Sequence, residues 1–392
     1  MKERLLSLDV FRGLTIAGML LVNNPGTWSA VYPPLEHAAW FGWTPADLIF
    51  PFFLFIVGIT TRLSLSSRHE RGADDAALVR QILRRSALIM LAGLLLTGFP
   101  YHSFYVEFPG GLVFDSRTAH LDLAHWRLTG VLQRIALCYA LGALLTLRTT
   151  VKQQALILAA LLCGYWFALT RLPVPGRGPG GPLLGVPDGS LAAWLDRALL
   201  GTNHLWSGSR TWDPEGILST VPAIGTVILG TFAGRWLQDS RPLPVRLAAL
   251  FAAGALLMAA GSAWHCWFPI AKNIWTSSFV LFTGGAAAVV LTACLWLVDL
   301  KRVTWWTKPF VVYGVNPLTA YVGSSFLARW LYTLVKVPTS AGLVPLQTAI
   351  FNAAYAPWLE PRAASLLFAL SYVALWWIVL AAMSRRGIVL RF

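Results

Sequence analysis

A succession of apolar runs, most of them about twenty residues long, constrains this chain more than any other feature. A run of that length crosses the ~30 Å hydrocarbon core of a bilayer as an α-helix. The runs fall near 8–24, 46–62, 82–99, 129–147, 154–171, 217–236, 245–265, 274–298, 309–328 and 364–383. Charged residues make up 12% of the chain, whereas a soluble domain carries ~25%. We therefore expect an all-α polytopic membrane protein with about ten transmembrane helices, forming a single domain over residues 1–392.

Two segments need a separate interpretation. The weaker apolar run at 341–358 contains Pro345, Asn352 and Pro357, and proline interrupts helical hydrogen bonding. We interpret it as a re-entrant or interfacial segment. The first run carries Asp9 and Arg12 where a signal peptide would be purely apolar, so we expect a retained first helix.

Basic residues are distributed unevenly between the connecting segments. With the N-terminus in the cytoplasm, the inner segments include six arginines between Arg62 and Arg85, whereas the outer segment 24–45 has none. Cytoplasmic loops carry an excess of Lys and Arg. Both termini are therefore expected in the cytoplasm, with periplasmic loops at 24–45, 100–128 and 172–216. The net charge of +14 reflects this orientation, and we expect no nucleic-acid partner.

Residues 37–58, HAAWFGWTPADLIFPFFLFIVG, are the most informative stretch for function. His37 and Trp40 directly precede an apolar helix that begins near Asp47. An imidazole at the membrane boundary is suited to proton transfer, because histidine both takes and gives a proton near neutral pH. The alternative is an interfacial histidine beside tryptophans of the membrane–water boundary.

Further polar residues lie within or next to the apolar runs, where ionisable groups are costly and usually pair or line a cavity. Asp9 and Arg12 share one helix face, so they form an ion pair, or Arg12 holds an anionic cofactor at the cytosolic end. The other candidates are Asn23, Gln133, Arg134, Asp213, Glu215, Lys272, Asn273, Tyr313 and Asn316. Structural readings stay open for several of them, since acids at a helix N-terminus are favourable for capping alone.

Seven motifs occur in order along the chain: LDVFRGLTIAGMLLVNN, HAAWFGWTPADLIFPFFLFIVG, GVLQRIAL, DRALLGTNHLW, DPEGILSTVPAIGTVILG, KNIWTSSFV and YGVNPLTAYVG. Together they resemble the heparan-α-glucosaminide N-acetyltransferase family, whose bacterial relatives include YeiB-like and NagX-like membrane proteins. The resemblance implies transfer of an acetyl group from cytosolic acetyl-CoA to an amino sugar or glycan on the periplasmic side of a bacterial inner membrane. It also implies that His37 is the active histidine, and that Asn23 is the asparagine ending the preceding helix.

These motifs assign roles to the candidate residues. His37 would act as the base that deprotonates the acceptor amine, or as a transient nucleophile, and Asn23 would stabilise the oxyanion. We expect acetyl-CoA to be the acetyl donor, and we expect no metal. The expected partners are a small-molecule or glycan acceptor and the lipid bilayer. A homodimer stays open. The expected cofactor-binding residues are Arg12, Tyr313 and Asn316, and the expected substrate-binding residues are Trp40, Asp47, Gln133, Arg134, Asp213, Glu215, Lys272 and Asn273.

Two departures from the lysosomal enzymes of that family affect the outer side. By this resemblance, the segment NNPGTWSAVYPPLEH is longer and richer in proline. We also expect this chain to lack their extra lumenal domain and first helix. Both departures leave the acceptor open. A permease for amino sugars or related solutes is the alternative function. Secondary transporters are commonly built from internal repeats, however, and the DVFRG and HAAW motifs of the first half have no counterpart in the second.

Overall fold

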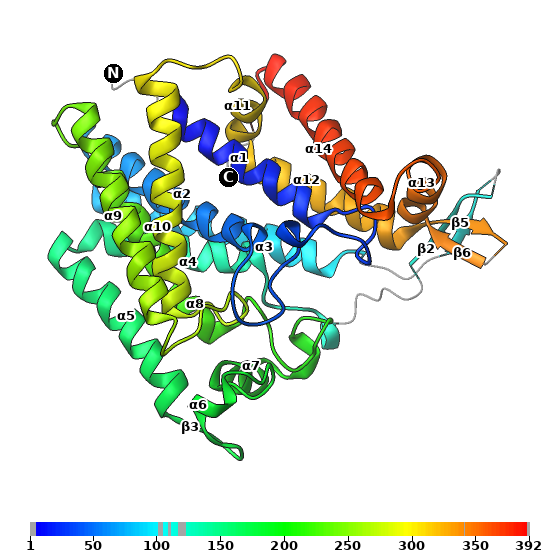
Figure 1. Cartoon of the computed structure of the whole chain (residues 1–392), viewed down its shortest axis with the longest axis horizontal. Coiled ribbons are helices and arrows are strands. Elements are labelled where there is room, and N and C mark those ends of the chain that lie inside the picture. The colour runs from blue at the N-terminus through cyan, green and yellow to red at the C-terminus, as the bar shows by residue number, and fades with distance from the viewer. Residues whose placement is uncertain (1–4, 101–104, 109–110, 117–122, 341, 390–392) are drawn as a thin grey trace.

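The computed structural model describes residues 5–100, 105–108, 111–116, 123–340 and 342–389. Within these ranges the chain is mostly helical, and its long helices pack against one another (Figure 1). They are α1 (Leu6–Asn23), α2 (Pro45–His69), α3 (Asp75–Gly98), α4 (Val131–Arg148), α5 (Val151–Arg171), α8 (Ile217–Leu237), α9 (Leu243–Trp264), α10 (Ser277–Cys294), α11 (Lys308–Val315), α12 (Pro317–Arg329) and α14 (Pro361–Arg385). Shorter helices lie in the connections, namely α6 (Gly180–Leu183), α7 (Leu191–Leu200) and α13 (Leu346–Ala354).

The predicted all-α polytopic architecture is confirmed. Each of the ten apolar runs contains a helix, and eight helices of the described part are long and apolar enough to cross a membrane. The other two runs, 82–99 and 309–328, do not form a single long apolar helix of this kind. Helix α3 has Arg80, Arg84 and Arg85 in its first half, so only its second half is continuously apolar. The run at 309–328 is divided into α11 and α12.

The division between α11 and α12 lies at Asn316. This residue has φ −124° and ψ 55°, which is outside the helical region. The next residue, Pro317, has no backbone N–H and disfavours a helical conformation in the residue before it. The Asn316 side-chain amide donates to the carbonyl of Ile388, 3.2 Å away, beyond the end of α14. The Asn316–Pro317 pair therefore interrupts the helix in the middle of this span.

The described residues of the 341–358 segment, 342–358, contain no helix long enough to span a membrane. They include a strand, Gly342–Pro345 (β6), followed by α13 of nine residues. Nine residues cover ~14 Å as a helix, about half of a membrane crossing. The interpretation as a re-entrant or interfacial segment stays a prediction.

The helices divide into central and peripheral ones. In α8, 78% of the apolar span is buried inside the protein, and in α9 the share is 17%. Helices α5 and α14 are also mostly exposed, and α5 and α9 lie at the margin of the molecule in Figure 1. An apolar helix that is exposed around most of its circumference needs lipid as its solvent. We infer that α5, α9 and α14 form much of the lipid-facing surface.

Close packing of α2 against α8 depends on two glycines. A methyl group placed on Gly58 would lie 2.1 Å from the carbonyl oxygen of Val227, and one on Gly230 would lie 2.1 Å from that of Phe55. Small residues let two membrane helices approach at backbone distance. Because α2 begins directly after the loop carrying His37, this contact also fixes the position of the candidate site.

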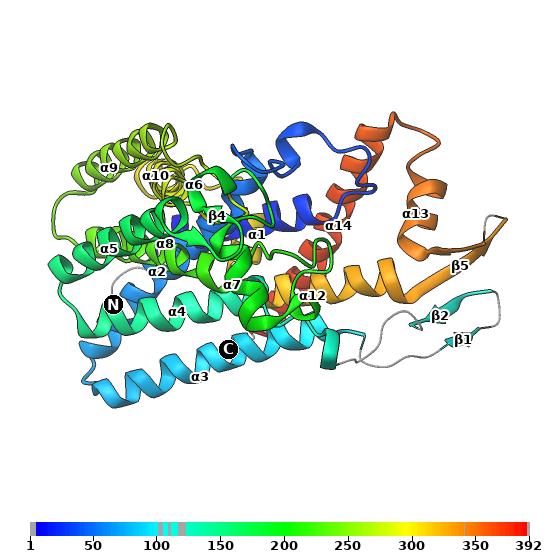
Figure 2. The same cartoon turned by 90° about the horizontal axis from the view of Figure 1, so that it is seen from below.

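A small β-sheet at one end of the molecule was not predicted from the sequence. It contains β1 (Tyr105–Glu107), β2 (Val113–Asp115), β5 (Val335–Thr339) and β6 in the order β1-β2-β5-β6, all antiparallel. Figure 2 shows the sheet at the end of the molecule remote from α5 and α9. Strands of three to five residues are too short to give a periodic signal. Part of the predicted loop 100–128, residues 101–104, 109–110 and 117–122, lies outside the described residues.

The start of the 172–216 loop is rich in proline and glycine. It holds a two-strand hairpin of β3 (Pro173–Val174) and β4 (Gly178–Pro179), followed by the single turn α6. The next helix of this loop is α7, which has ten residues. A four-residue helix such as α6 is too short to give an apolar period in the sequence.

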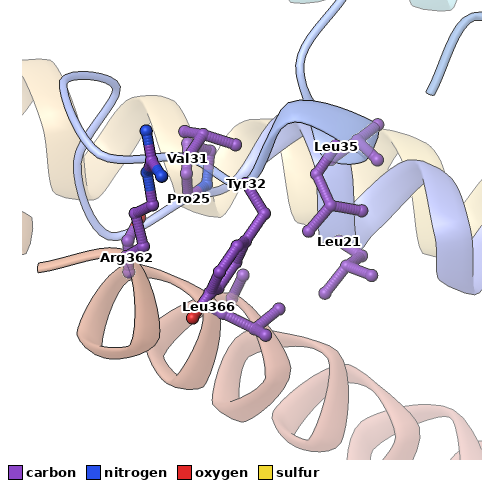
Figure 3. A pocket seen from close by; sticks show the side chains of 10 residues that line it. Leu21, Pro25, Val31, Tyr32, Leu35, Arg362 and Leu366 are labelled. Atoms are coloured by element: carbon purple, nitrogen blue, oxygen red, sulfur yellow. The ribbon is translucent and has the colours of Figure 1, made fainter. Parts of the chain in front are cut away.

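The 24–45 loop is fixed against the start of α14. The Tyr32 hydroxyl donates to Glu360 Oε1 at 3.2 Å, and the backbone N–H of Gly26 donates to the carbonyl of Ser365 at 3.2 Å. Figure 3 shows Tyr32 between the loop and α14, beside Leu366. The crevice there measures about 10 Å³, which is room for about one water. The loop is thus well anchored ahead of His37.

The α2–α8 contact gives a first prediction. Replacing Gly230 by Ala should force the two backbones apart and destabilise the protein by ~1–3 kcal/mol, the usual cost of overpacking. Thermal unfolding of the purified protein in detergent measures it. The matched control is Gly164→Ala in exposed α5, where an added methyl meets nothing within 4 Å and stability should stay equal or rise slightly. Equal melting temperatures for Gly230→Ala and wild type would contradict the packing role.

Candidate active site

His37 and Asp47 meet at the N-terminus of α2. Thr44 is the N-cap residue, and its backbone N–H donates to Asp47 Oδ2 at 3.0 Å in a reciprocal capping box. The other carboxylate oxygen, Asp47 Oδ1, lies 2.8 Å from His37 Nδ1. The Asp47 side chain is fully buried, whereas 38% of the His37 side chain is exposed. A buried acid thus orients an imidazole that remains accessible from outside.

The loop before α10 brings a third charged group to this pair. Lys272 Nζ lies 3.0 Å from His37 Nδ1 and 3.4 Å from Asp47 Oδ1. Burial lowers the pKa of the Lys272 amine, and the negative charges of Asp47 and Glu215 partly oppose that shift. The neighbouring Asn273 donates its side-chain N–H to the carbonyl of Ala39 at 3.2 Å, so the two loops are held together.

Aromatic rings form one wall next to the histidine. The Trp40 indole N–H donates to the carbonyl of Leu184 at 2.7 Å, which joins the 24–45 loop to the 172–216 loop. Its ring meets Trp212 edge to face with 5.1 Å between centroids, and Trp212 in turn meets Trp206. Rigid indoles at this place offer an apolar face for a sugar ring next to a polar site.

A second charged cluster lies in the outer loops. Arg127 Nη2 lies 2.6 Å from Asp213 Oδ1 and 2.7 Å from Glu215 Oε2, so one guanidinium holds both acids predicted from the sequence. The Thr129 hydroxyl and the Trp206 backbone N–H also donate to Asp213 Oδ2. Although burial raises it, the pKa of Asp213 stays below its usual range because of the hydrogen bond from Arg127.

Sequence reasoning did not select Arg127. Although burial lowers the pKa of its guanidinium, the charges of Glu215 and Asp213 raise it above the usual value, so Arg127 stays charged. An available signal was its position, because an arginine at the outer end of an apolar run runs against the positive-inside pattern. A cavity of about 250 Å³ next to it is lined by Arg210, Arg329 and Trp206 as well. The cluster therefore presents both signs of charge at the outer surface.

Asp196 is a further buried acid that the sequence did not reveal. It lies on α7, and its Oδ1 accepts the backbone N–H of Ile217 at 2.8 Å, at the first residue of α8. Gly216 packs against it so closely that a methyl there would lie 1.9 Å from Asp196 Oδ2. Burial raises the pKa of Asp196 to about 7, an effect that the nearby Asp213 charge reinforces.

Gln133 and Arg134 are buried between helices. The Arg134 guanidinium lies over the Trp275 ring, 5.1 Å from its centroid, and donates to the Ser219 hydroxyl and to the carbonyl of Gly216. These contacts connect α4 with α8 and with the loop before α10. Packing explains these contacts of Arg134, although its Nε and Nη1 and the Nε2 of Gln133 are buried without a hydrogen-bond partner among the described residues. The predicted role of both residues in substrate binding stays a prediction.

Asn23 is the last residue of α1 and its side chain is exposed. Within the described residues its side chain makes no hydrogen bond, whereas the neighbouring Asn24 is buried and caps the helix by donating to the carbonyl of Leu20 at 2.8 Å. Asn24 thus takes the structural role of a helix-terminal asparagine. Asn23 remains accessible on the same side of the protein as His37, without a contact between the two.

The predicted cofactor residues lie toward the opposite end of the helices. Arg12 Nη1 lies 3.2 Å from Asp9 Oδ1 and donates to the carbonyl of Gly314 at 2.9 Å, which confirms the predicted ion pair. The Tyr313 hydroxyl donates to the carbonyl of Val373 at 2.5 Å, and the side chains of Tyr313 and Asn316 are buried. Both therefore hold α11 against α14 in this structure.

A cavity of about 550 Å³ opens beside Arg12. Arg12, Arg68 and Arg85 line it together with apolar side chains such as Phe53 and Ile135. Its lining on α2 runs from Phe53 to Arg68, which is ~22 Å along the helix axis. Phe53 is six residues after Asp47, or ~9 Å along α2. The cavity thus extends from the basic end of the helices to the neighbourhood of the His37–Asp47 pair.

Comparison with known proteins identifies the relatives of this chain. The family model described as "Heparan-alpha-glucosaminide N-acetyltransferase, catalytic" matches residues 4–263. This chain belongs to the heparan-α-glucosaminide N-acetyltransferase family. The match includes His37, Asp47 and the whole of the α2–α8 contact, whereas Lys272 lies beyond it.

Curated family members match over a longer part of the chain. The protein named heparan-alpha-glucosaminide N-acetyltransferase from Mus musculus is 31% identical over 374 residues, which cover 84% of this chain and 54% of that protein. The protein of the same name from Homo sapiens is 31% identical over 368 residues, with 82% and 52% covered. This chain therefore spans about half the length of the curated relatives it matches. The resemblance seen in the motifs is confirmed at the level of the family.

The buried acid on α7 gives a prediction about stability. An aspartate in the unfolded chain ionises near pH ~3.9, whereas folded Asp196 has its pKa raised to about 7. Between these values the folded protein binds more protons, so stability should fall as pH rises from about 4 to about 7 and then level off. Asp196→Asn keeps an acceptor for the Ile217 N–H and removes this pH-dependent part of the stability.

Melting temperatures of wild type and Asp196→Asn across this range test it, and a difference independent of pH would contradict the assignment. Asp188→Asn is the control, because the exposed Asp188 has its pKa lowered by the hydrogen bond from Arg177. The contribution of Asp188 to stability is present at neutral pH and is lost as pH falls. Its pH dependence therefore has the opposite sign to that of Asp196, and the contribution should be small because the Asp188–Arg177 pair is exposed.

Proposed function

We propose that this chain is a transmembrane N-acetyltransferase. It takes the acetyl group of cytosolic acetyl-CoA and transfers it to the amine of an amino sugar or glycan at the periplasmic face of a bacterial inner membrane. The observation that carries the proposal is the His37–Asp47 pair with 2.8 Å between Nδ1 and Oδ1, at the outer end of a helix whose inner part lines a basic cavity. Membership in the acetyltransferase family supports it.

His37 supplies the proton transfer that amide formation needs. Attack of an amine on a thioester carbonyl requires removal of a proton from nitrogen. With Nδ1 donating to Asp47, the ring presents the lone pair of Nε2 to the acceptor, and the buried carboxylate stabilises the imidazolium that forms. The 38% exposure of the His37 side chain lets an acceptor reach it from the outer side.

Asn23 supplies a donor for the oxyanion in this proposal. Its side-chain amide is exposed at the outer end of α1 and is not used to cap that helix, because Asn24 does so. A preorganised N–H donor aimed at the developing negative charge is worth ~2.7–4 kcal/mol of transition-state stabilisation. Binding of substrate between α1 and the His37 loop would bring this donor to the reacting carbonyl.

The cavity at the inner end fits the donor substrate. Acetyl-CoA supplies an activated acetyl thioester on a long, flexible arm that ends in a phosphorylated nucleotide. Arg12, Arg68 and Arg85 suit its phosphates, because guanidinium groups bind phosphate in a bidentate manner. The apolar lining near Phe53 suits the pantetheine arm, and the cavity follows α2 toward His37. The break at Asn316 lies beside this cavity, since the adjacent Val315 and Pro317 line it. Tyr313 holds α11 against α14 there.

The outer cluster fits an amino-sugar acceptor. Glu215 offers a carboxylate oxygen to hydroxyl and amine groups of the acceptor. The fully buried Asp213 and its partner Arg127 hold Glu215 in place, through the Glu215 backbone N–H and the Glu215 carboxylate respectively. Trp40 and Trp212 provide the apolar face on which a sugar ring stacks. Lys272 and Asn273 join this region to His37. The acceptor amine is thereby presented to the imidazole from outside, while the donor arrives through the helices.

The central test uses purified protein, radiolabelled acetyl-CoA and a panel of amino sugars. Wild type should form acetylated sugar. His37→Ala should abolish it, and Asp47→Asn should reduce kcat by on the order of 10²–10⁴, the contribution of a positioned base. His69→Ala, an exposed histidine at the other end of α2, should retain full activity. Product formation that survives His37→Ala would refute the site, and amino-sugar uptake into proteoliposomes without acetyl-CoA would favour the permease instead.

A second prediction distinguishes direct transfer from an acetyl-histidine intermediate. We favour direct transfer, because an acetyl-imidazole on a side chain exposed to the outer solution would hydrolyse. Rapid mixing with acetyl-CoA alone should then release no burst of CoA, since both substrates must be bound together. A burst stoichiometric with enzyme in wild type, absent in His37→Ala, would establish the covalent route and refute direct transfer.

A further inference from the structure

One ring nitrogen of His37 has two polar neighbours, of which one can only accept a hydrogen bond from it and the other can only donate one to it. Its Nδ1 lies 2.8 Å from Asp47 Oδ1 and 3.0 Å from Lys272 Nζ. A carboxylate oxygen only accepts hydrogen bonds, and an ammonium group only donates them. In a neutral imidazole Nδ1 carries either an N–H or a lone pair, so it satisfies one neighbour at a time. The two contacts therefore belong to two different tautomers of His37.

We propose that Lys272 is a positioning residue that selects the tautomer of His37. When its ammonium donates to Nδ1, the ring proton lies on Nε2, and His37 has no lone pair for the acceptor amine. When Lys272 is neutral, or pairs with Asp47 instead, Nδ1 donates to Asp47 and Nε2 becomes the base. This inference rests on the proposed function for its catalytic consequence, but the tautomer itself is a property of the resting protein.

The geometry of Asp47 makes the competition specific. Its Oδ2 already accepts the backbone N–H groups of Ala38 and Thr44, each at 3.0 Å, so that oxygen is committed to the loop and the helix cap. Only Oδ1 remains for the imidazole at 2.8 Å and for the lysine at 3.4 Å. A small movement of the Lys272 amine from Nδ1 toward Oδ1 therefore separates the inactive arrangement from the competent one.

The charges facing Lys272 decide how easily it changes state. They are His37 and Asp47 from the start of α2, and Glu215 from the loop before α8. Burial favours the neutral amine, and both carboxylates favour the ammonium. Glu215 is itself held by Arg127 at 2.7 Å in the outer cluster. A cationic amino sugar bound at Glu215 would offset that carboxylate, favour loss of the Lys272 proton, and so activate His37.

The proton balance of the change is simple. Lys272 gives one proton to water and becomes a neutral amine. The ring proton of His37 leaves Nε2 for solvent, and Nδ1 takes up one proton in return, so the charge of the imidazole is unchanged. No redox partner is needed. An acceptor that arrives as an ammonium first loses one proton to water and becomes a neutral amine. During acetyl transfer its nitrogen forms the C–N bond as the C–S bond breaks, and it gives a further proton to the vacant Nε2, which passes that proton to the departing CoA thiolate.

The tautomer is measured directly by nitrogen-15 NMR of protein labelled at histidine, since protonated and unprotonated ring nitrogens resonate far apart. His37 is assigned by the signals lost in His37→Gln. In wild type the proton should lie on Nε2 while Lys272 is charged and should move to Nδ1 as pH rises. In Lys272→Met it should lie on Nδ1 wherever the ring is neutral, and in Lys272→Arg, which stays charged, on Nε2.

Lys336→Met is the matched control, because Lys336 pairs with Asp115 in the outer β-sheet and leaves His37 untouched. It should show the wild-type tautomer. The same tautomer and pH dependence in wild type and Lys272→Met would overturn the proposal. If Lys272→Arg failed to fold, the comparison of wild type with Lys272→Met would still decide it.

The activity readout separates this inference from the proposed function. In wild type, loss of the Lys272 proton should contribute to the increase of kcat with pH. In Lys272→Met that contribution should be absent. In Lys272→Arg, kcat should fall by on the order of 10²-fold at every pH, the smaller end of a base contribution. Full kcat in Lys272→Arg at all pH values would overturn the tautomer role. Absence of acetyl transfer in wild type would refute the proposed function instead, while the NMR result would still stand.

Discussion

The buried carboxylate of Asp47 is the interaction on which the candidate site depends. One oxygen caps α2 and holds the loop through the N–H groups of Thr44 and Ala38, and the other orients His37. A capping contact of this kind stabilises a helix by about 1 kcal/mol, and an anion at a helix N-terminus gains from the helix dipole as well. The same atoms therefore fix the helix start and the geometry of the candidate site, so the His37–Asp47 pair cannot shift without loss of the cap.

Several charged groups at the ends of the helices have a defined partner. Asp213 and Glu215 share Arg127, and Lys272 lies against Asp47. Arg134, by contrast, is buried in the interior and rests on the Trp275 ring as well as on polar oxygens. A cation over an aromatic face recovers part of its desolvation cost. These ion pairs and hydrogen bonds connect loops that lie far apart in the sequence.

Sequence patterns predicted the helices and selected His37 and Asp47, although not the contact between their side chains, for physical reasons that also explain the omissions. Apolar runs determine transmembrane helices strongly. Arg127 and Asp196 were missed because single-sequence reasoning has no access to pairings between residues far apart in the chain. Arg127 is 88 residues from Glu215, and Asp196 is 21 residues from Ile217. The sheet was missed because its strands are too short to show a period.

Helix α2 connects the candidate site at one end of the protein with the basic cavity at the other. Its first turn carries Asp47 at the outer side, and its last turns carry Arg68 at the cavity, so the two are 21 residues or ~32 Å apart along the axis. That length is about the thickness of the hydrocarbon core. A donor with a charged nucleotide need not cross the membrane if its thioester reaches along the cavity while its phosphates stay at the arginines. The close contact of Gly58 with α8 keeps this helix fixed. In the proposed reaction, a fixed helix of membrane length would let a cytosolic donor meet an acceptor that stays outside.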